Sequence, residues 1–323
     1  MAKVKSIIGC EISTNEIRAV ELTKENGEYK ILAMGYMPLE EGIIEEGFIR
    51  DADRFNTAIT QLIASGNFQT TDIAVAVNNE NVLMRFASFP KVDSDKLRNM
   101  VLLQAQEFIP IPIQEMEVDY VVAGETTDDD NNPQTNVMLI AARRQMLEGY
   151  INIFTASKLQ IQDIDSSLLA YCRGINEICN GAKYGIVNLV DDVLNFIVVH
   201  GSEISMVRSI TIPEKTHRSV AEIFKNSRDG EYSEEDFEAV ASFLMQETSS
   251  TISYYAMQNN IPMEKIYFIA NASAADKLVS VLSENVYIPI EIPQFYPALQ
   301  STSVTPLGEY ASCIGVAISG LEG

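Results

Sequence analysis

Two stretches of the sequence combine polar side chains with a tight turn between apolar strands, and the first is GCEISTNEIR at residues 9–18. Such a unit can hold nucleotide phosphates, because the backbone N–H groups of a tight turn converge on an anion. Binding is favoured by an Asp at the base of the hairpin, which positions a metal ion, and by a Gly in the turn, which lets the backbone approach the phosphate. Here Glu11 stands at the Asp position and Ser13 at the Gly position, followed by Thr14 and Asn15.

The second stretch is VNLVDDVLN at residues 187–195. Asn188 stands at its Asp position, and Val190 stands at its Gly position beside Asp191, so a β-branched side chain crowds the phosphate path. A third segment follows the strand KIYFI. A Gly-Gly pair at this place would let adenosine approach the backbone, but Asn271 and the alanines on either side of it stand there instead. Changes in three separate segments predict a degenerate nucleotide site that binds its ligand weakly.

Other catalytic chemistry finds little support in the sequence. The two histidines, His200 and His217, have no Ser/Asp or Cys partners in a suitable context for nucleophilic catalysis. Neither a phosphate-binding Walker loop nor a G-x-G-x-x-G or G-x-S-x-G motif occurs. The acidic run Asp128–Asp130 lacks the spaced ligands of a cation site, and the four cysteines lack zinc spacing and are expected as buried free thiols. We therefore expect no catalytic residue and no metal site.

The turns of these two stretches belong to two three-stranded meanders that open the two halves of the chain. Strands are predicted at residues 5–37 and again at 184–212, and Asn26-Gly27 supplies the left-handed backbone of one hairpin turn. Superposing Glu11 on Asn188 aligns the two strand–turn–strand patterns. The offset between them is more than half the length of the chain. An internal repeat of this length predicts a duplicated α/β fold with two lobes.

The region between residues 84 and 163 interrupts the first half of this repeat. Two helices (Ser94–Phe108 and Met146–Lys158) and two strands (Glu117–Gly124 and Asn136–Ala142) are predicted there. We therefore expect an inserted module. The predicted boundaries are 1–83 with 164–182 and the C-terminal helix at 303–323 for the first lobe, 84–163 for the insertion, and 183–302 for the second lobe with a helical subdomain at about 213–261.

The charge of the chain limits its partners. Its 323 residues include 45 Asp and Glu against 23 Lys and Arg, a formal net charge of −22. Such a surface repels nucleic-acid phosphates and the anionic inner leaflet of a membrane, and it attracts basic partners. Because no apolar run reaches the length of a membrane span, we expect a cytoplasmic protein.

Several segments also carry a family resemblance: FPKVDSDKLR (89–98), QAQEFIPIPI (104–113), VDY (118–120), LIAARR (139–144), QETSSTISYY (246–255) and IGVAI (314–318). They resemble the PilM family of type IV pilus assembly proteins, which is related to the cell-division protein FtsA, and the likeness spans nearly the whole chain. FtsA itself is a poorer match, because the chain ends in SGLEG without an amphipathic membrane helix.

The resemblance implies a two-lobed actin-like fold, which is a duplicated ribonuclease H-like fold, with the insertion placed as in FtsA. It further implies ATP between the lobes and a groove near the insertion that captures the cytoplasmic N-terminal peptide of PilN. We expect this groove near Arg85, Phe108, Ile111 and Arg143, and the alternative for Phe108 and Ile111 is a place in the core of the inserted module. The residues of the altered hairpins do not suit the ATP and magnesium that the resemblance implies. We therefore expect no tightly bound cofactor.

Two functions then fit the sequence. One is a scaffold held at the inner membrane by its protein partners, with a PilN-type tail as the main partner and homo-oligomers as a further one. The other is an ATP-binding or ATP-hydrolysing actin-like switch in pilus assembly or type II secretion. Stabilisation by nucleotide distinguishes the two, because a ligand that binds only the folded state raises its stability.

Overall fold

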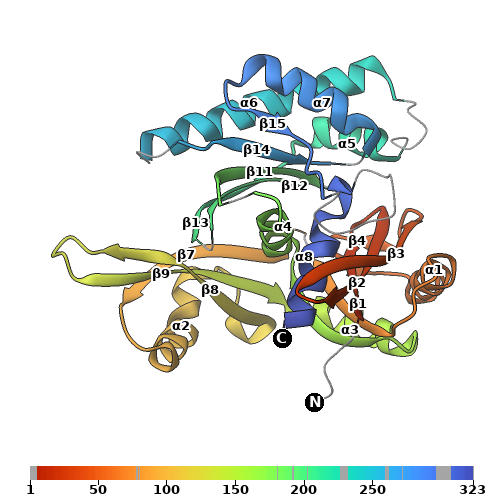
Figure 1. The fold of residues 1–323 in the computed structure, drawn as a ribbon, viewed down its shortest axis with the longest axis horizontal. Helices are drawn as coiled ribbons and strands as arrows, with labels where there is room; N and C mark the ends of the chain where they lie inside the picture. Colours follow the sequence, from red (N-terminus) through yellow and green to blue (C-terminus); the bar gives the residue numbers. More distant parts are fainter. Residues whose placement is uncertain are drawn as a thin grey trace.

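The computed structural model (Figure 1) describes residues 6–77, 79, 81–179, 181–190, 193–201, 203–225, 232–258, 262–270, 272–295 and 307–322. Its first five-stranded sheet has the order β10-β6-β1-β2-β3. The elements of this region are β1 (Ser6–Ile12), β2 (Glu16–Glu25), β3 (Glu28–Pro38), the short pair β4 (Ile44–Glu45) and β5 (Phe48–Ile49), α1 (Ala52–Ser65), β6 (Asp72–Val77), α3 (Arg144–Ala156) and β10 (Gln160–Ser166).

The second five-stranded sheet has the order β13-β12-β11-β14-β15. Its elements are β11 (Lys183–Val190), β12 (Val193–His200), β13 (Glu203–Thr211), α5 (Glu214–Lys225), α6 (Glu234–Gln258), β14 (Lys265–Ile269), α7 (Ala272–Asn285) and β15 (Ile290–Glu291). The side chains of α5, α6 and α7 cover one face of this sheet and form a core with Phe196, Phe268 and their neighbours.

Both sheets consist of an antiparallel meander continued by two parallel strands, in the same spatial order. The duplicated fold predicted from the repeat is therefore confirmed. The hairpin turn at Asn26-Gly27 is also confirmed, since both residues have positive φ angles of 53° and 89°. Glycine and asparagine tolerate this left-handed backbone, which matches the twist of the flanking strands.

A third sheet, β7-β9-β8, lies between the two halves of the first one in the sequence. It comprises β7 (Val82–Pro90), β8 (Met116–Thr127) and β9 (Pro133–Arg143), with α2 (Ser94–Phe108) and the 3₁₀ turn η1 (Ile113–Glu115). Alternate side chains divide its two faces: Val118, Leu139 and Ala141 pack under α2, whereas Val121, Met138 and Ile140 face the rest of the molecule. Strand β7 was not predicted, because its partner β9 lies far downstream.

Helix α3 packs differently from the expectation for the inserted module. Its buried residues Met146, Tyr150 and Phe154 join the core of the first sheet, where Phe154 meets Phe55 of α1 edge to face. Tyr150 also donates a hydrogen bond to the carbonyl of Gly47 at 2.7 Å. The third sheet and α2 thus form one packed unit, and the predicted module 84–163 additionally contains a helix of the first-sheet core.

Helices α4 (Ser167–Asn176) and α8 (Ala311–Glu322) lie between the two large sheets, in the centre of the molecule (Figure 1), and η2 (Gly308–Tyr310) precedes α8. They pack closely because each contributes a glycine at the crossing. A Cβ atom on Gly315 would lie 1.7 Å from the carbonyl oxygen of Ala170, and one on Gly174 would lie 2.5 Å from that of Ala311. A larger residue at either position would therefore push the two helices apart.

Candidate functional site

The first predicted hairpin forms as expected. Strands β1 and β2 pair antiparallel with Glu11 opposite Arg18, and the backbone N–H and hydroxyl of Ser13 both donate to the carbonyl of Glu16. The carbonyl of Asn15 accepts from the N–H of Leu39 at 2.7 Å, which ties the turn to the end of β3. Thr14 is half-buried in the same turn. The predicted residues of this hairpin are therefore brought together.

A buried arginine occupies the base of this hairpin. Arg18 is only 4% exposed, and its guanidinium lies 2.9 Å from Glu16 and 3.6 Å from Glu11. It also donates to the backbone carbonyl of Glu309 in η2. Burial opposes the charge of this guanidinium, but Glu16, Glu11 and Glu309 outweigh it and raise the pKa of Arg18 further. Arg18 therefore stays charged.

Two residues from the central helices complete this cluster. The hydroxyl of Tyr171 in α4 donates to Glu11 at 2.6 Å, and burial together with the neighbouring Glu11 carboxylate raises the pKa of Tyr171 well above its usual value. The thiol of Cys313 in α8 lies 3.4 Å from the carbonyl oxygen of Arg18 and donates to it. Hydrogen bonds thus connect the first hairpin to both α4 and α8. We call Glu11, Glu16, Arg18, Tyr171 and Glu309 the Arg18 cluster.

The second hairpin has a neutral pair at the equivalent position. Asn188 faces Asn195 across β11 and β12, and both are buried. Asn188 donates to the carbonyl of Ile269 at 3.4 Å, and Asn195 accepts from Ser209 at 2.7 Å. Two of the amide atoms, Oδ1 of Asn188 and Nδ2 of Asn195, have no hydrogen-bond partner among the described residues. The side chain of Val190 and the residues Asp191 and Asn271 lie outside the described part of the chain.

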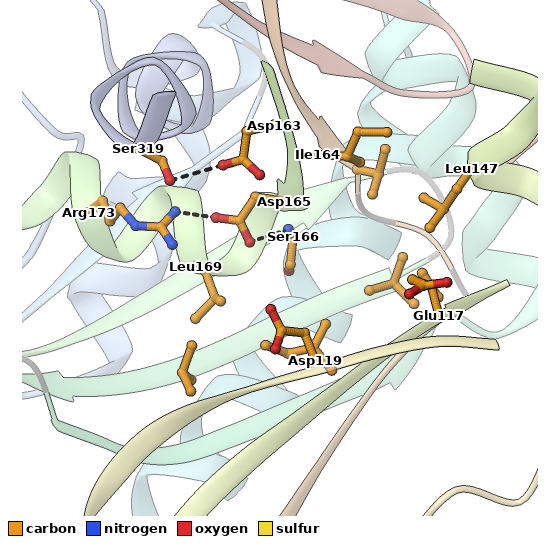
Figure 2. A pocket seen from close by; sticks show the side chains of 15 residues that line it. Glu117, Asp119, Leu147, Asp163, Ile164, Asp165, Ser166, Leu169, Arg173 and Ser319 are labelled. Carbon is orange, nitrogen blue, oxygen red and sulfur yellow. Dashed lines mark hydrogen bonds and ion pairs between the residues drawn. The ribbon is translucent and has the colours of Figure 1, made fainter. Parts of the chain in front are cut away.

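A groove opens between the insertion and the first lobe, with a volume of about 310 Å³. Figure 2 shows Asp163 and Asp165 on one side and Glu117 and Asp119 on the β8 strand across from them. Apolar side chains form much of its lining: Val77, Val82, Val121, Ile140, Ala142, Leu147, Ile164 and Leu169. The groove therefore combines an apolar surface with carboxylates on both sides.

The charges of this groove are only partly balanced. Arg173 of α4 pairs with Asp165, and Ser319 of α8 donates to Asp163 at 3.0 Å (Figure 2). Burial raises the pKa of Asp165, and the Arg173 guanidinium works against that effect. Of the two carboxylates on β8, Glu117 lies 3.0 Å from Arg144, and the largely exposed Asp119 lies 3.8 Å from Arg98 of α2. Four carboxylates and one guanidinium thus belong to the groove lining itself, which makes the lining acidic, while Arg144 and Arg98 pair with its β8 side from outside.

The four residues predicted to bind a partner are not brought together. Phe108 and Ile111 pack within the insertion core under α2, where Phe108 lies against Phe89 with ring centroids 6.1 Å apart. Arg85 is exposed and donates to the carbonyl of Met84. Arg143 pairs with Glu115 at 2.9 Å, at a separate polar hollow beside η1. Phe108 at the end of α2 and Ile111 just after it pack on the face of the third sheet that carries Leu139 and Ala141, and the groove is lined from the other face, by Ile140 and Ala142.

The functional candidates that the sequence patterns missed are Arg18 and the groove residues Asp163, Asp165 and Arg173. A charged residue inside an otherwise apolar strand, as in EIRAVEL, is the one local signal for Arg18. A buried charge needs partners, but those of Arg18 come from elements far away in the sequence. The groove residues carry no comparable local signal.

Two five-stranded sheets of identical order, with paired hairpins and helices between them, define an actin-like fold. The family described as "Type IV pilus assembly protein PilM" matches residues 9–210. The chain belongs to this family of type IV pilus assembly proteins. Among the described residues, no helix is long and apolar enough to cross a membrane.

Solved structures share this fold. One, titled "PilM-PilN type IV pilus biogenesis complex", aligns with 99% of this chain and 100% of its own, with a TM-score of 0.81 and 19% identity. The ethanolamine utilization protein EutJ from Carboxydothermus hydrogenoformans aligns with 97% of this chain and 89% of its own, with a TM-score of 0.55 and 9% identity. At these identities the likeness is one of fold.

Proposed function

We propose that the chain is a scaffold of type IV pilus assembly that binds the cytoplasmic N-terminal tail of a PilN-type membrane protein. The observation that carries this proposal is the acidic groove with its apolar lining between the insertion and the first lobe. The similar structure titled as a PilM–PilN complex supports the choice of partner. The chain would then lie on the cytoplasmic side of the inner membrane through this tail.

The charge of the groove suits such a tail. Membrane proteins carry an excess of Lys and Arg on their cytoplasmic flanks, so a tail of this kind is drawn to a chain of net charge −22. Apolar residues of the tail would contact Val121, Ile140 and Leu169, and a basic residue would lie between Asp163 and Glu117. The electrostatic attraction speeds association, and the apolar contacts provide much of the affinity.

The Arg18 cluster supports the second part of the proposal, that the nucleotide site is degenerate and the chain is not an ATPase. The Glu11 carboxylate, which stands where a metal-positioning Asp would be, already accepts from Tyr171 and lies beside Arg18. A metal ion there would have to displace a buried guanidinium at high cost. The residues present therefore do not fit ATP and its metal ion.

A labelled N-terminal peptide of the PilN-type protein from the same organism tests the tail site by fluorescence anisotropy. The variant Glu117→Gln/Asp119→Asn removes two groove charges, and we expect it to weaken binding by about tenfold, in line with charge pairs of 0.5–1 kcal/mol each. Affinity should also fall as salt rises, because salt screens this attraction.

The matched control is Asp129→Asn/Asp130→Asn, which removes the same charge from the exposed β8–β9 loop of the insertion. It should leave the affinity nearly unchanged. Equal loss in both double variants would mean that net charge alone attracts the tail, and no binding by the wild type at low salt would reject this partner.

A further inference from the structure

The Arg18 cluster and the tail groove share two helices. In α4, Tyr171 contacts Glu11 of the cluster, while Leu169 and Arg173, two residues away on either side, line the groove. In α8, Cys313 contacts the backbone of Arg18, and Ser319 lines the groove and holds Asp163. Each helix therefore touches the cluster at one place and the groove at another.

These two helices are in direct backbone contact with each other. The glycines Gly174 and Gly315 bring the backbones into direct contact, so that a methyl group at either position would overlap a carbonyl oxygen of the other helix. Packed helices of this kind transmit a displacement, because the contact leaves no free volume to absorb it. A shift of Tyr171 or Cys313 away from β1 and β2 would therefore change the position of Leu169, Arg173 and Ser319.

The guanidinium of Arg18 is what holds the cluster together. The buried carboxylates of Glu11 and Glu16 lie 3.6 and 2.9 Å from this guanidinium, and the buried Glu309 adds a further negative charge near it. Without it they would repel one another in a buried environment, where charges are poorly screened. Movement of η2 and the central helices away from the first hairpin would relieve this repulsion.

We propose that Arg18 is a positioning residue for the tail groove: its guanidinium takes the place of a bound ligand at the hairpin and holds α4 and α8 where the groove is formed. The proposal rests on the proposed function, since the groove is its readout. Under this proposal, tail binding does not require a nucleotide, because the cation that holds the Arg18 cluster together belongs to the chain itself.

The test measures tail affinity by anisotropy and stability by thermal melting for four variants of the full chain. Arg18→Met should weaken tail binding by about tenfold, within the range of coupling between sites. Arg18→Lys, which keeps the charge, should retain most of the affinity. Tyr171→Phe cuts the link between the cluster and α4 without removing a charge, and it should weaken binding by about threefold, at the low end of such coupling.

The control is Arg208→Met. Arg208 pairs with Glu247 at 3.0 Å and with Thr251, and it contacts neither central helix through these groups. Its loss should lower stability while leaving tail affinity unchanged.

Wild-type affinity in both Arg18→Met and Tyr171→Phe would overturn the positioning role and leave tail binding intact. If Arg18→Met does not fold, Tyr171→Phe alone decides. A wild type that does not bind the tail would reject the proposed function, and the positioning role would be rejected with it.

Discussion

The hairpins of the two lobes share one geometry and differ in their chemistry. Glu11 faces Arg18 in the first lobe, and Asn188 faces Asn195 at the same register in the second. The charged pair has partners from α4 and η2, whereas the neutral pair leaves two amide atoms without a hydrogen bond. One sheet order thus accommodates an ionic link to distant elements in one lobe and a nearly self-contained polar pair in the other.

The comparison indicates which polar pair should contribute more to the stability of the molecule. A buried ion pair costs much to break, because removal of one partner leaves an uncompensated charge. A buried amide with poor hydrogen bonds can be replaced by an apolar side chain at little cost. The two hairpins should therefore respond very differently to substitution.

The largest effect is expected for Arg18→Met. It leaves Glu11, Glu16 and Glu309 buried without their cation, so the free energy of unfolding should fall by about 3–5 kcal/mol. Urea denaturation monitored by circular dichroism measures the change. A loss below about 1 kcal/mol, typical of exposed ion pairs, would show that the charged hairpin is no different from the neutral one.

Glu11→Gln should have a smaller effect on the same pair. Arg18 keeps Glu16 and the Glu309 carbonyl, and the glutamine oxygen can still accept from Tyr171. We expect a loss of about 1–2 kcal/mol, near that of one hydrogen bond to a charged group. The Asn188→Asp variant, which adds a charge to the second lobe instead, serves as the counterpart and should also destabilise, because the residue that faces it there is the neutral Asn195.

The two hairpins should also differ in how they contribute to stability at alkaline pH. Tyr171 of the Arg18 cluster can lose a proton, whereas the pair Asn188 and Asn195 contains no titratable group. The pKa of Tyr171 is raised in the folded chain, so its contribution to stability is complete below about pH 10 and is lost as pH rises further. Relative to wild type, Tyr171→Phe should reduce the slope of stability above pH 10 by up to about 1.4 kcal/mol per pH unit. Parallel slopes for the two proteins would contradict this.

Asn188→Val should be close to neutral. It removes a long hydrogen bond of 3.4 Å together with an unpaired buried oxygen, and valine suits a buried strand. The expected change in the free energy of unfolding is below about 1 kcal/mol in either direction. A loss of 3 kcal/mol or more, as large as that expected for Arg18→Met, would remove the contrast between the lobes.

The smallest expected effect is that of nucleotide. If the proposed function holds, millimolar ATP with magnesium should not shift the melting temperature of the wild type, because Glu11 of the first hairpin is already paired with Arg18 and Tyr171. Differential scanning fluorimetry checks this, because a micromolar dissociation constant would add about 4 kcal/mol of stability at that concentration. Such a shift would favour the ATP-dependent switch over the scaffold.

Much of the fold could be predicted from the sequence, because the information is local. Alternating apolar residues specify the meander strands, Asn26-Gly27 specifies a turn, and Ser233 with its acidic neighbours marks the beginning of α6. The repeat of these patterns was sufficient to predict the duplication. The helix at residues 94–108 was also predicted with its observed ends.

The candidate site was predicted only in part. The residues of the first hairpin are neighbours in the sequence, so Glu11, Ser13 and Asn15 could be placed together. The partner residues could not: Phe108 and Ile111 are apolar and close to the insertion, but the pattern does not say which face of the third sheet meets the first lobe. Helix α3 illustrates the same limit, since its apolar face could pack on the insertion or on the first sheet.

By itself, the sequence determined the strands of the two meanders, their repeat and the net charge that favours a basic partner. The tertiary structure decided that Arg18 is a buried cation rather than a surface charge, and that Asp163 and Asp165 face Glu117 across a groove. The physical reason is distance along the chain. Backbone conformation and hydrophobic period depend on adjacent residues, whereas the partners of a buried charge come from wherever the fold brings a carboxylate, a hydroxyl or a carbonyl within a few ångströms.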